Sequence, residues 1–210
     1  MRRGVLVGVW AMWALGVSGQ RGLGVRFASQ FTQISRPEAA GLVPGYFSAF
    51  AVGPVYVDYR QNGGGEVGLN VIVKDLAEGF NLPVVMRDFD GGQNTALTAL
   101  ELEARVGPRF GWLYPQLGGQ LGYRLRSKGF FEGGAPPGSG VNRLYLNLPL
   151  GVALHLPTSF GTVGASVHYT VGLSNWARNP DGRTGWQGGT ALGWRVGLHL
   201  VFGEPTPSGG

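Results

Sequence analysis

The amino-acid sequence predicts an all-β fold, an eight-stranded antiparallel up-and-down β-barrel. Most of eight successive segments place an apolar residue at every second position, the period that puts neighbouring side chains on opposite faces of a strand. Glycine accounts for 39 of the 210 residues, 43% of the chain is hydrophobic and only 14% is charged. Glycine weakens helices, and disordered chains are more polar and more charged. The composition therefore favours long strands joined by glycine-rich turns.

The clearest segment runs from Leu144 to Leu156, where every second residue is aliphatic. Strands in soluble sheets are usually about 5–6 residues long, whereas a tilted strand needs about 9–11 residues to cross a bilayer. This segment has the length and the unbroken apolar face that a membrane-spanning strand requires. We therefore expect the barrel to be a transmembrane β-barrel.

Four strands are predicted before residue 107. The second of them, within Tyr46–Arg60, alternates poorly and is interrupted by Pro54, which cannot donate a ladder hydrogen bond. The other three alternate regularly. Their apolar positions are Leu23, Val25 and Phe27 in the first strand (near 22–31), Val67, Leu69, Val71 and Val73 in the third, and Leu100, Leu102, Ala104 and Val106 in the fourth.

The four later strands alternate over longer stretches, and the sixth of the eight is the Leu144–Leu156 segment. Glycine and polar residues occupy most of the opposite face in the other three. The apolar positions are Leu113, Leu117, Leu121, Tyr123 and Leu125 in the fifth strand, Val163, Ala165, Val167, Tyr169, Val171 and Leu173 in the seventh, and Leu192, Trp194, Val196, Leu198, Leu200 and Phe202 in the last.

The predicted connections alternate between short and long. The short ones are at Gln61–Gly65, Gly107–Phe110 and Pro157–Phe160, and the long ones are near 32–45, 75–95, 127–140 and 175–188. Bacterial outer-membrane barrels have short turns at the periplasmic end and long loops outside. An even number of strands places both termini at the end with the short turns.

The composition of the two faces predicts which one is outside. One face carries bulky leucine and valine, and the other carries glycine interleaved with arginine, glutamine, histidine and glutamate. An eight-stranded barrel has room inside only for its own side chains, so we expect the small and polar face to line the lumen. A soluble, lipocalin-like barrel that holds an apolar ligand inside is the alternative.

The N-terminus predicts export from the cytoplasm. Arg2 and Arg3 precede the apolar run Gly4–Leu15, and small residues follow before a cleavage site ahead of Gln20. The apolar run is short for a membrane-spanning helix, which needs about 20 residues. We expect residues 1–19 to be a signal peptide, residues 20–203 to form the barrel and residues 204–210 to be a flexible tail.

The charge and cysteine content exclude several kinds of chemistry. The chain has no cysteine, which rules out disulfides and thiolate catalysis. The net charge of +5 includes the two arginines of the signal peptide. The other arginines are scattered and form no nucleic-acid motif, so no nucleic-acid partner is expected.

The last predicted strand resembles the C-terminal signal that the barrel-assembly machinery reads in outer-membrane proteins. The pattern is a polar residue, a glycine, an apolar residue and a final aromatic residue, which here are Arg195, Gly197, Leu200 and Phe202. Phe202 departs from the pattern because it is not the last residue of the chain. The barrel-assembly machinery and the lipid bilayer are therefore expected partners.

The sixth strand also resembles a known family. Its segment Arg143–Leu150 is similar to the Tyr-Leu-x-x-Pro-Leu strand of the PorT-like, OmpX-like small outer-membrane β-barrel proteins. The resemblance implies an outer-membrane location and a structural or protein-interaction role, as a small subunit of an envelope or secretion assembly. A lipid-modifying outer-membrane enzyme is the alternative within the same location.

A set of charged residues is expected to meet inside the barrel. The fourth and eighth strands of a closed eight-stranded barrel lie opposite each other, so Glu101 and Glu103 could reach across the lumen to Arg195. Buried charges persist only when they are paired and hydrogen-bonded. This predicts a carboxylate–guanidinium plug, with a proton or solute path as the alternative. The expected polar set is Arg26, Glu101, Glu103, Arg105, Arg124, Arg126, Arg143 and Arg195.

No enzymatic site is expected. Ser166 and His168 are two residues apart, but their position in the alternation places both in the lumen, as it does His155 and His199. These histidines form no metal-ligand cluster, so neither a metal nor another cofactor is predicted.

The long connections offer the remaining candidate surface. The apolar segment Phe80–Phe89 is unusual for a loop and suggests a protein partner. Aromatic residues in the other long connections suit the interfacial belt of a membrane barrel; they are Phe130, Phe131, Trp176 and Trp186.

Overall fold

The computed structural model describes the strands and short turns of the chain. The described residues are 19–34, 46–60, 62–73, 96–128, 140–158, 160–175, 177–178, 190–202 and 205–206. The eight long strands are β1 (Gly19–Ile34), β2 (Tyr46–Arg60), β3 (Gly63–Val73), β4 (Ala96–Pro108), β5 (Leu113–Lys128), β7 (Leu144–Thr158), β8 (Gly161–Asn175) and β10 (Thr190–Phe202). Each predicted strand coincides with one of them. No helix in these ranges is long and apolar enough to cross a membrane.

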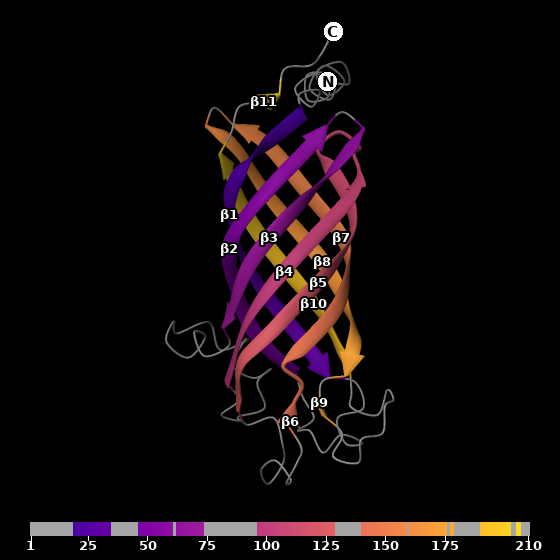
Figure 1. Ribbon diagram of the computed structural model, residues 1–210. Coiled ribbons are helices and arrows are strands. Elements are labelled where there is room, and N and C mark those ends of the chain that lie inside the picture. The colour runs from indigo at the N-terminus through magenta and orange to yellow at the C-terminus, as the bar shows by residue number, and fades with distance from the viewer. Residues whose placement is uncertain are drawn as a thin grey trace, which may run out of the picture.

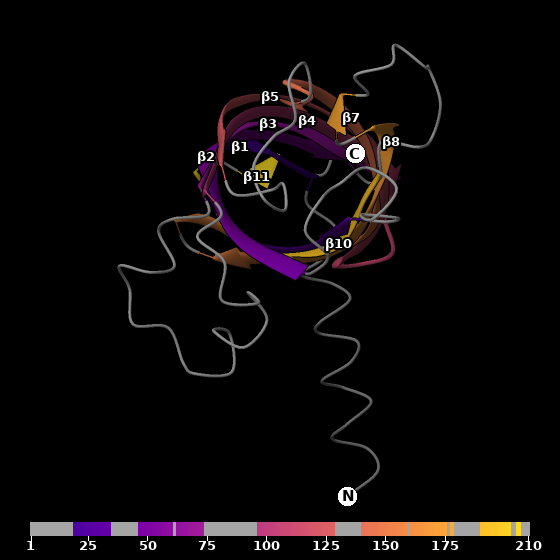
Figure 2. The same ribbon diagram turned by 90° about the horizontal axis from the view of Figure 1, so that it is seen from below.

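The eight long strands form a closed antiparallel up-and-down barrel, which confirms the predicted fold class (Figures 1 and 2). Each long strand pairs with the next one along the chain, and β10 returns to pair with β1. The closing register runs from Leu23 opposite Phe202 to Ile34 opposite Ala191. Closure removes the unpaired edges that an open sheet would expose.

The two ends of the barrel differ, as the connection lengths predict. Three short turns lie at one end, between β2 and β3, between β4 and β5 and between β7 and β8, together with the start of β1 and the end of β10 (top of Figure 1). We call this the turn end and the opposite one the loop end. Gly111, with a φ of 67°, occupies the left-handed conformation that the turn before β5 requires.

The second strand is continuous through Pro54 because the ladder is interrupted there. Pairing of β2 with β3 lapses between Val52 and Val55, while Pro54 still pairs with Val25 of β1. Pro149 of β7 behaves in the same way, since the pairing of β7 with β5 lapses opposite Gly118 and Gly119. Each proline lacks an N–H to donate, and each lies where one neighbouring ladder is absent.

The apolar face of each strand points outward. In β7, Leu146, Leu148 and Leu150 are exposed, whereas Tyr145 and Asn147 between them are buried in the lumen. The same alternation holds in β10, where Trp194, Val196 and Leu198 are exposed and Arg195 is buried. The structure therefore gives the orientation that the composition of the two faces predicts.

The abundance of glycine follows from the bulk of the lumen side chains. Tyr145 lies directly opposite Gly122 on β5, and His199 lies directly opposite Gly164 on β8. A Cβ atom at Gly122 would lie 1.9 Å from Cζ of Tyr145, and one at Gly164 would lie 1.9 Å from Nε2 of His199. A large side chain on one strand thus occupies the space that its neighbour leaves empty.

Three shorter strands complete the described chain. At the loop end, β6 (Gly140–Val141) pairs with β9 (Ala177–Arg178). At the turn end, β11 (Pro205–Thr206) pairs with the first two residues of β1. The predicted flexible tail at 204–210 therefore contains two paired residues. Residues 1–18, which carry nearly all of the predicted signal peptide, and the Phe80–Phe89 segment lie outside the described residues.

Candidate functional site

A network of six charged side chains lies in the lumen. It joins three arginines to three glutamates from four strands, and each side chain is 1% exposed or less. Three of the six follow from the period of two, because Glu101, Glu103 and Arg105 occupy alternate positions of β4 and point inward together. The other members are Arg26 of β1, Glu66 of β3 and Arg195 of β10.

Glu103 is at the centre of this lumen network. Its Oε2 accepts from Nη1 of Arg26 at 3.0 Å and from Nη1 of Arg195 at 3.3 Å. Its Oε1 accepts from Nε of Arg105 and from Nε2 of Gln120, the latter at 3.0 Å. Nδ2 of Asn70 adds a further hydrogen bond of 3.3 Å to Oε2. One carboxylate thus joins all three arginines.

Glu66 forms a second centre near the turn end. It accepts from Nη2 of Arg26, and Nη1 of Arg105 lies 3.2 Å from its Oε1. The Tyr59 hydroxyl donates to Oε2 at 2.9 Å and itself accepts from Nε2 of Gln116 at 2.5 Å. Glu66 is not a member of the polar set expected from the sequence. Its position in the alternation of β3, two residues before Gly68 and four before Asn70, is the signal that could have identified it.

Arg195 connects opposite walls of the barrel. Its Nη1 donates to Oε1 of Glu101 on β4 at 2.5 Å, and its Nη2 donates to Oε1 of Gln30 at 2.5 Å. The hydroxyl of Tyr145 donates to the other oxygen of Glu101 at 3.1 Å. The structure therefore brings both β4 glutamates against Arg195, the contact expected from the relative positions of the strands.

The histidine of the Ser166–His168 pair extends the network. Nη1 of Arg105 lies 2.6 Å from Nε2 and 2.8 Å from Nδ1 of His168, and Nε2 also lies 2.8 Å from Oε1 of Gln116. His168 thus holds a hydrogen-bonding position within the ion network, and Ser166 is buried beside it in the lumen.

The remaining two histidines close the lumen toward the turn end. Nε2 of His199 lies 3.4 Å from Nδ1 of His155, and the ring centroids are 4.5 Å apart. Tyr59 and Tyr114 pack edge-on against His155 at centroid distances of 4.5 and 4.8 Å. Within the described residues, no group of three or more histidine, aspartate or glutamate side chains is arranged to hold a metal ion.

Two arginines that the sequence assigned to the lumen lie outside it. Arg143 is exposed, and its Nη1 donates to the hydroxyl of Tyr123 at 3.2 Å. It is exposed because it lies in a bend before β7 begins, where the alternation of the strand does not extend. Arg126 is exposed because the register of β4 and β5 shifts between Thr98 and Ala99, which reverses the facing of the residues beyond the irregularity. Both assignments to the polar cluster are wrong.

Arg124 lies in the lumen but closer to the loop end. It is buried, its guanidinium lies 4.5 Å from the centroid of the Tyr145 ring, and its Nη1 donates to the carbonyl of Asn142. It is linked to the six charged residues through Tyr145, which contacts Glu101. Of the eight residues predicted for the polar set, five join the network directly, Arg124 is adjacent, and Arg126 and Arg143 are excluded.

The residues of the C-terminal assembly pattern lie on β10, the strand that closes the barrel. Arg195 and Gly197 face the lumen, whereas Leu200 and Phe202 are exposed on the outer face. The lumen network as a whole can bear buried charge and resist separation of the barrel walls.

No protein-family model matches the chain, and a search of curated proteins finds no match either. The resemblance to PorT-like proteins remains a prediction.

Proposed function

We propose that the chain is an integral β-barrel of a bacterial outer membrane, with a structural or protein-interaction role and no enzymatic activity. The observation that carries the proposal is the apolar outer face of all eight long strands. Leu23, Val106 and Leu198, from three different strands, are 65%, 65% and 62% exposed. Monomeric soluble proteins rarely expose a contiguous apolar patch larger than a few hundred Å². A hydrocarbon environment would cover this face.

The distribution of charge outside the lumen supports the same proposal. Outside the lumen, the charged side chains that the structure describes lie near the two ends of the barrel and leave an apolar band between them. They are Arg21, Asp58, Arg60 and Arg109 toward the turn end, and Arg126 and Arg143 toward the loop end. The strands are 11 to 16 residues long, which meets or exceeds the about 9–11 residues that a tilted strand needs to cross a bilayer.

The filled lumen favours a membrane barrel over a lipocalin-like one. A soluble barrel that carries an apolar ligand needs an apolar interior and a polar exterior. Among the side chains whose burial the structure describes, the largest fully buried ones are Arg26, Arg105 and Arg195. We interpret the lumen network as a plug that braces the barrel walls, because its three carboxylates and three guanidiniums balance in charge.

An interaction role would use the loop end. Gly140–Val141 and Ala177–Arg178 pair there as β6 and β9, so chain from two different connections is joined beyond the barrel strands. Binding functions commonly lie on connections that a rigid scaffold holds. A role as a small subunit of an envelope or secretion assembly follows from the resemblance of the sixth predicted strand, and a pull-down from detergent-solubilised membranes would identify the partner.

Fractionation of cells followed by a carbonate wash tests the location. An integral barrel stays in the washed outer-membrane pellet, because carbonate removes proteins that are held only by charge. Recovery of folded protein in the soluble periplasmic fraction would contradict the proposal and favour the lipocalin-like barrel.

A further inference from the structure

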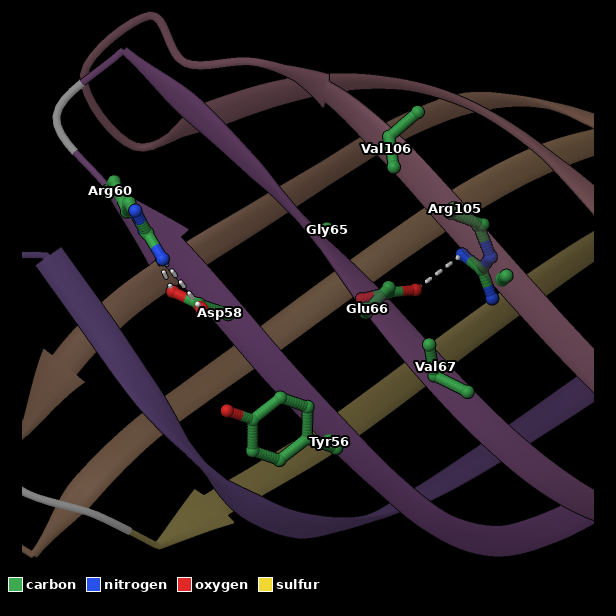
Figure 3. A pocket seen from close by; sticks show the side chains of 9 residues that line it. Tyr56, Asp58, Arg60, Gly65, Glu66, Val67, Arg105 and Val106 are labelled. Carbon is green, nitrogen blue, oxygen red and sulfur yellow. Dashed lines mark hydrogen bonds and ion pairs between the residues drawn. The ribbon is translucent and has the colours of Figure 1, made fainter.

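A hollow of about 300 Å³ lies in the outer wall of the barrel near the turn end, over β2, β3 and β4 (Figure 3). It arises because Gly65 of β3 has no side chain at an outward-facing position. Its cross-strand neighbours are Asp58 on β2 and Val106 on β4. Figure 3 shows Asp58 on one side of Gly65 and Val106 on the other. The hollow is therefore charged along one wall and apolar along the opposite one.

The charged wall carries both signs. Arg60 donates to the two carboxylate oxygens of Asp58 at 3.4 Å each, long hydrogen bonds that leave both groups able to bind a further partner. The side chain of Arg60 is 80% exposed and that of Asp58 is 31% exposed. Arg21, directly opposite Asp58 on β1, donates to the hydroxyl of Tyr56, another lining residue, at 2.5 Å. The guanidiniums of Arg21 and Arg60 and the carboxylate of Asp58 thus lie at this wall.

The apolar wall is formed by Val67, Ala104 and Val106. Ala104 lies directly opposite Val67, and its small side chain keeps the hollow open toward the middle of the barrel. Glu66 and Arg105 also border the hollow, but their side chains point into the lumen and pair with each other there. Nη1 of Arg105 lies 3.2 Å from Oε1 of Glu66, the contact drawn in Figure 3.

We propose that this hollow binds a phospholipid with a zwitterionic headgroup. The phosphate is held by Arg60 and the ammonium by Asp58, while the first part of one acyl chain lies over Gly65 and along Val67 and Ala104. Charge complementarity supports this occupant, because an anion and a cation joined by a short linker match an exposed guanidinium beside a carboxylate. The inference rests on the proposed membrane location, in which the turn end faces the phospholipid leaflet on the periplasmic side.

Native mass spectrometry of the purified barrel, folded in a non-ionic detergent, tests this site. The probes are phosphatidylethanolamine and phosphatidylglycerol with identical acyl chains, added in equal amounts. We expect one retained phosphatidylethanolamine and about three- to fivefold less phosphatidylglycerol, the selectivity that one exposed ion pair supplies. Asp58→Asn should remove this preference, and Arg60→Gln should weaken retention of both lipids.

Ala104→Leu tests the apolar wall, because the larger side chain fills the hollow without altering its charges. Ala165→Leu is the matched control. Ala165 faces outward on β8, four residues from Gly161 at the turn end, as Ala104 lies four residues from Pro108. Ala104→Leu should reduce phosphatidylethanolamine retention and Ala165→Leu should not.

Two kinds of failure are distinguishable. Equal retention of the two lipids by the unaltered barrel, or equal loss in the two leucine variants, would overturn the lipid site and leave the membrane location standing. A chain that folds and remains soluble in buffer without detergent would overturn the proposed location, and the lipid site with it.

Discussion

Arg195 of β10 donates to Glu101 of β4 across the barrel lumen, with 2.5 Å between Nη1 and Oε1. The two residues are 94 positions apart in the chain and neither is more than 1% exposed. A contact of this kind links two strands that share no ladder. It makes the lumen network a brace between opposite walls, and its energetic contribution can be measured by substitution.

Replacing Glu103 with Gln should destabilise the barrel strongly. The change removes the carboxylate that joins Arg26, Arg105 and Arg195, so a net positive charge is left buried. Removing one partner of a buried ion pair typically costs about 3–5 kcal/mol in the free energy of unfolding. Urea unfolding of the barrel in detergent measures the change.

Asp58→Asn is the control for this substitution, because it removes an exposed carboxylate whose ion pair contributes about 1 kcal/mol or less. Equal stability of Glu103→Gln and the unaltered barrel would rule out the plug.

The effects of Glu101→Gln and Arg195→Gln should not be additive. Each single change leaves a buried partner without its counter-ion, whereas the double change removes both charges together. We expect a coupling energy of about 0.5–3 kcal/mol from a double-mutant cycle measured by the same unfolding experiment. Additive losses would mean that the two side chains do not interact in the folded barrel.

Gly122→Val should disturb the lumen, whereas Gly119→Val should not. A Cβ atom at Gly122 would lie 1.9 Å from the ring of Tyr145, but one at Gly119 meets nothing within 4 Å. Overpacking typically costs about 1–3 kcal/mol, so the Gly122 variant should unfold at lower urea concentration. Similar midpoints for the two variants would show that Tyr145 does not occupy this space.

The unaltered barrel should not conduct ions steadily in a planar bilayer. The lumen network and the tilted pair of His155 and His199 occupy successive levels of the lumen. Removing the cross-lumen contact with Glu101→Ala and Arg195→Ala together should raise the conductance. A steady conductance in the unaltered protein that the double change leaves untouched would favour a solute path instead of a plug.

The alternation of residues was sufficient to predict the long strands other than β2, whose alternation is poor, and the facing of most side chains, because a period of two fails only where a strand bends or bulges. Arg126 and Arg143 lie beyond such irregularities, which is why both were wrongly placed in the lumen. The contact of Arg195 with Glu101 was predictable from strand count alone, since opposite walls follow from closure. The full network was not predictable from the sequence, because it depends on how far each side chain reaches across the lumen.

Like the full lumen network, the hollow at Gly65 could not be predicted from the sequence. It requires Asp58 and Val106 to flank a glycine on separate strands, and that juxtaposition depends on the registers of two ladders. The biological role could not be predicted either, because neither the fold nor the lumen network contains a feature that belongs to one activity alone.

The central claim is that the apolar face of the barrel lies against lipid, and spin labelling tests it most directly. The chain has no cysteine, so single cysteines at positions 145–150 of β7 each give one labelling site. In lipid vesicles, labels at 146, 148 and 150 should collide strongly with oxygen and weakly with a water-soluble nickel reagent, whereas labels at 145, 147 and 149 should be shielded from both. Strong collisions of the nickel reagent at 146, 148 and 150 would contradict the account, because the leucine face would then be in water.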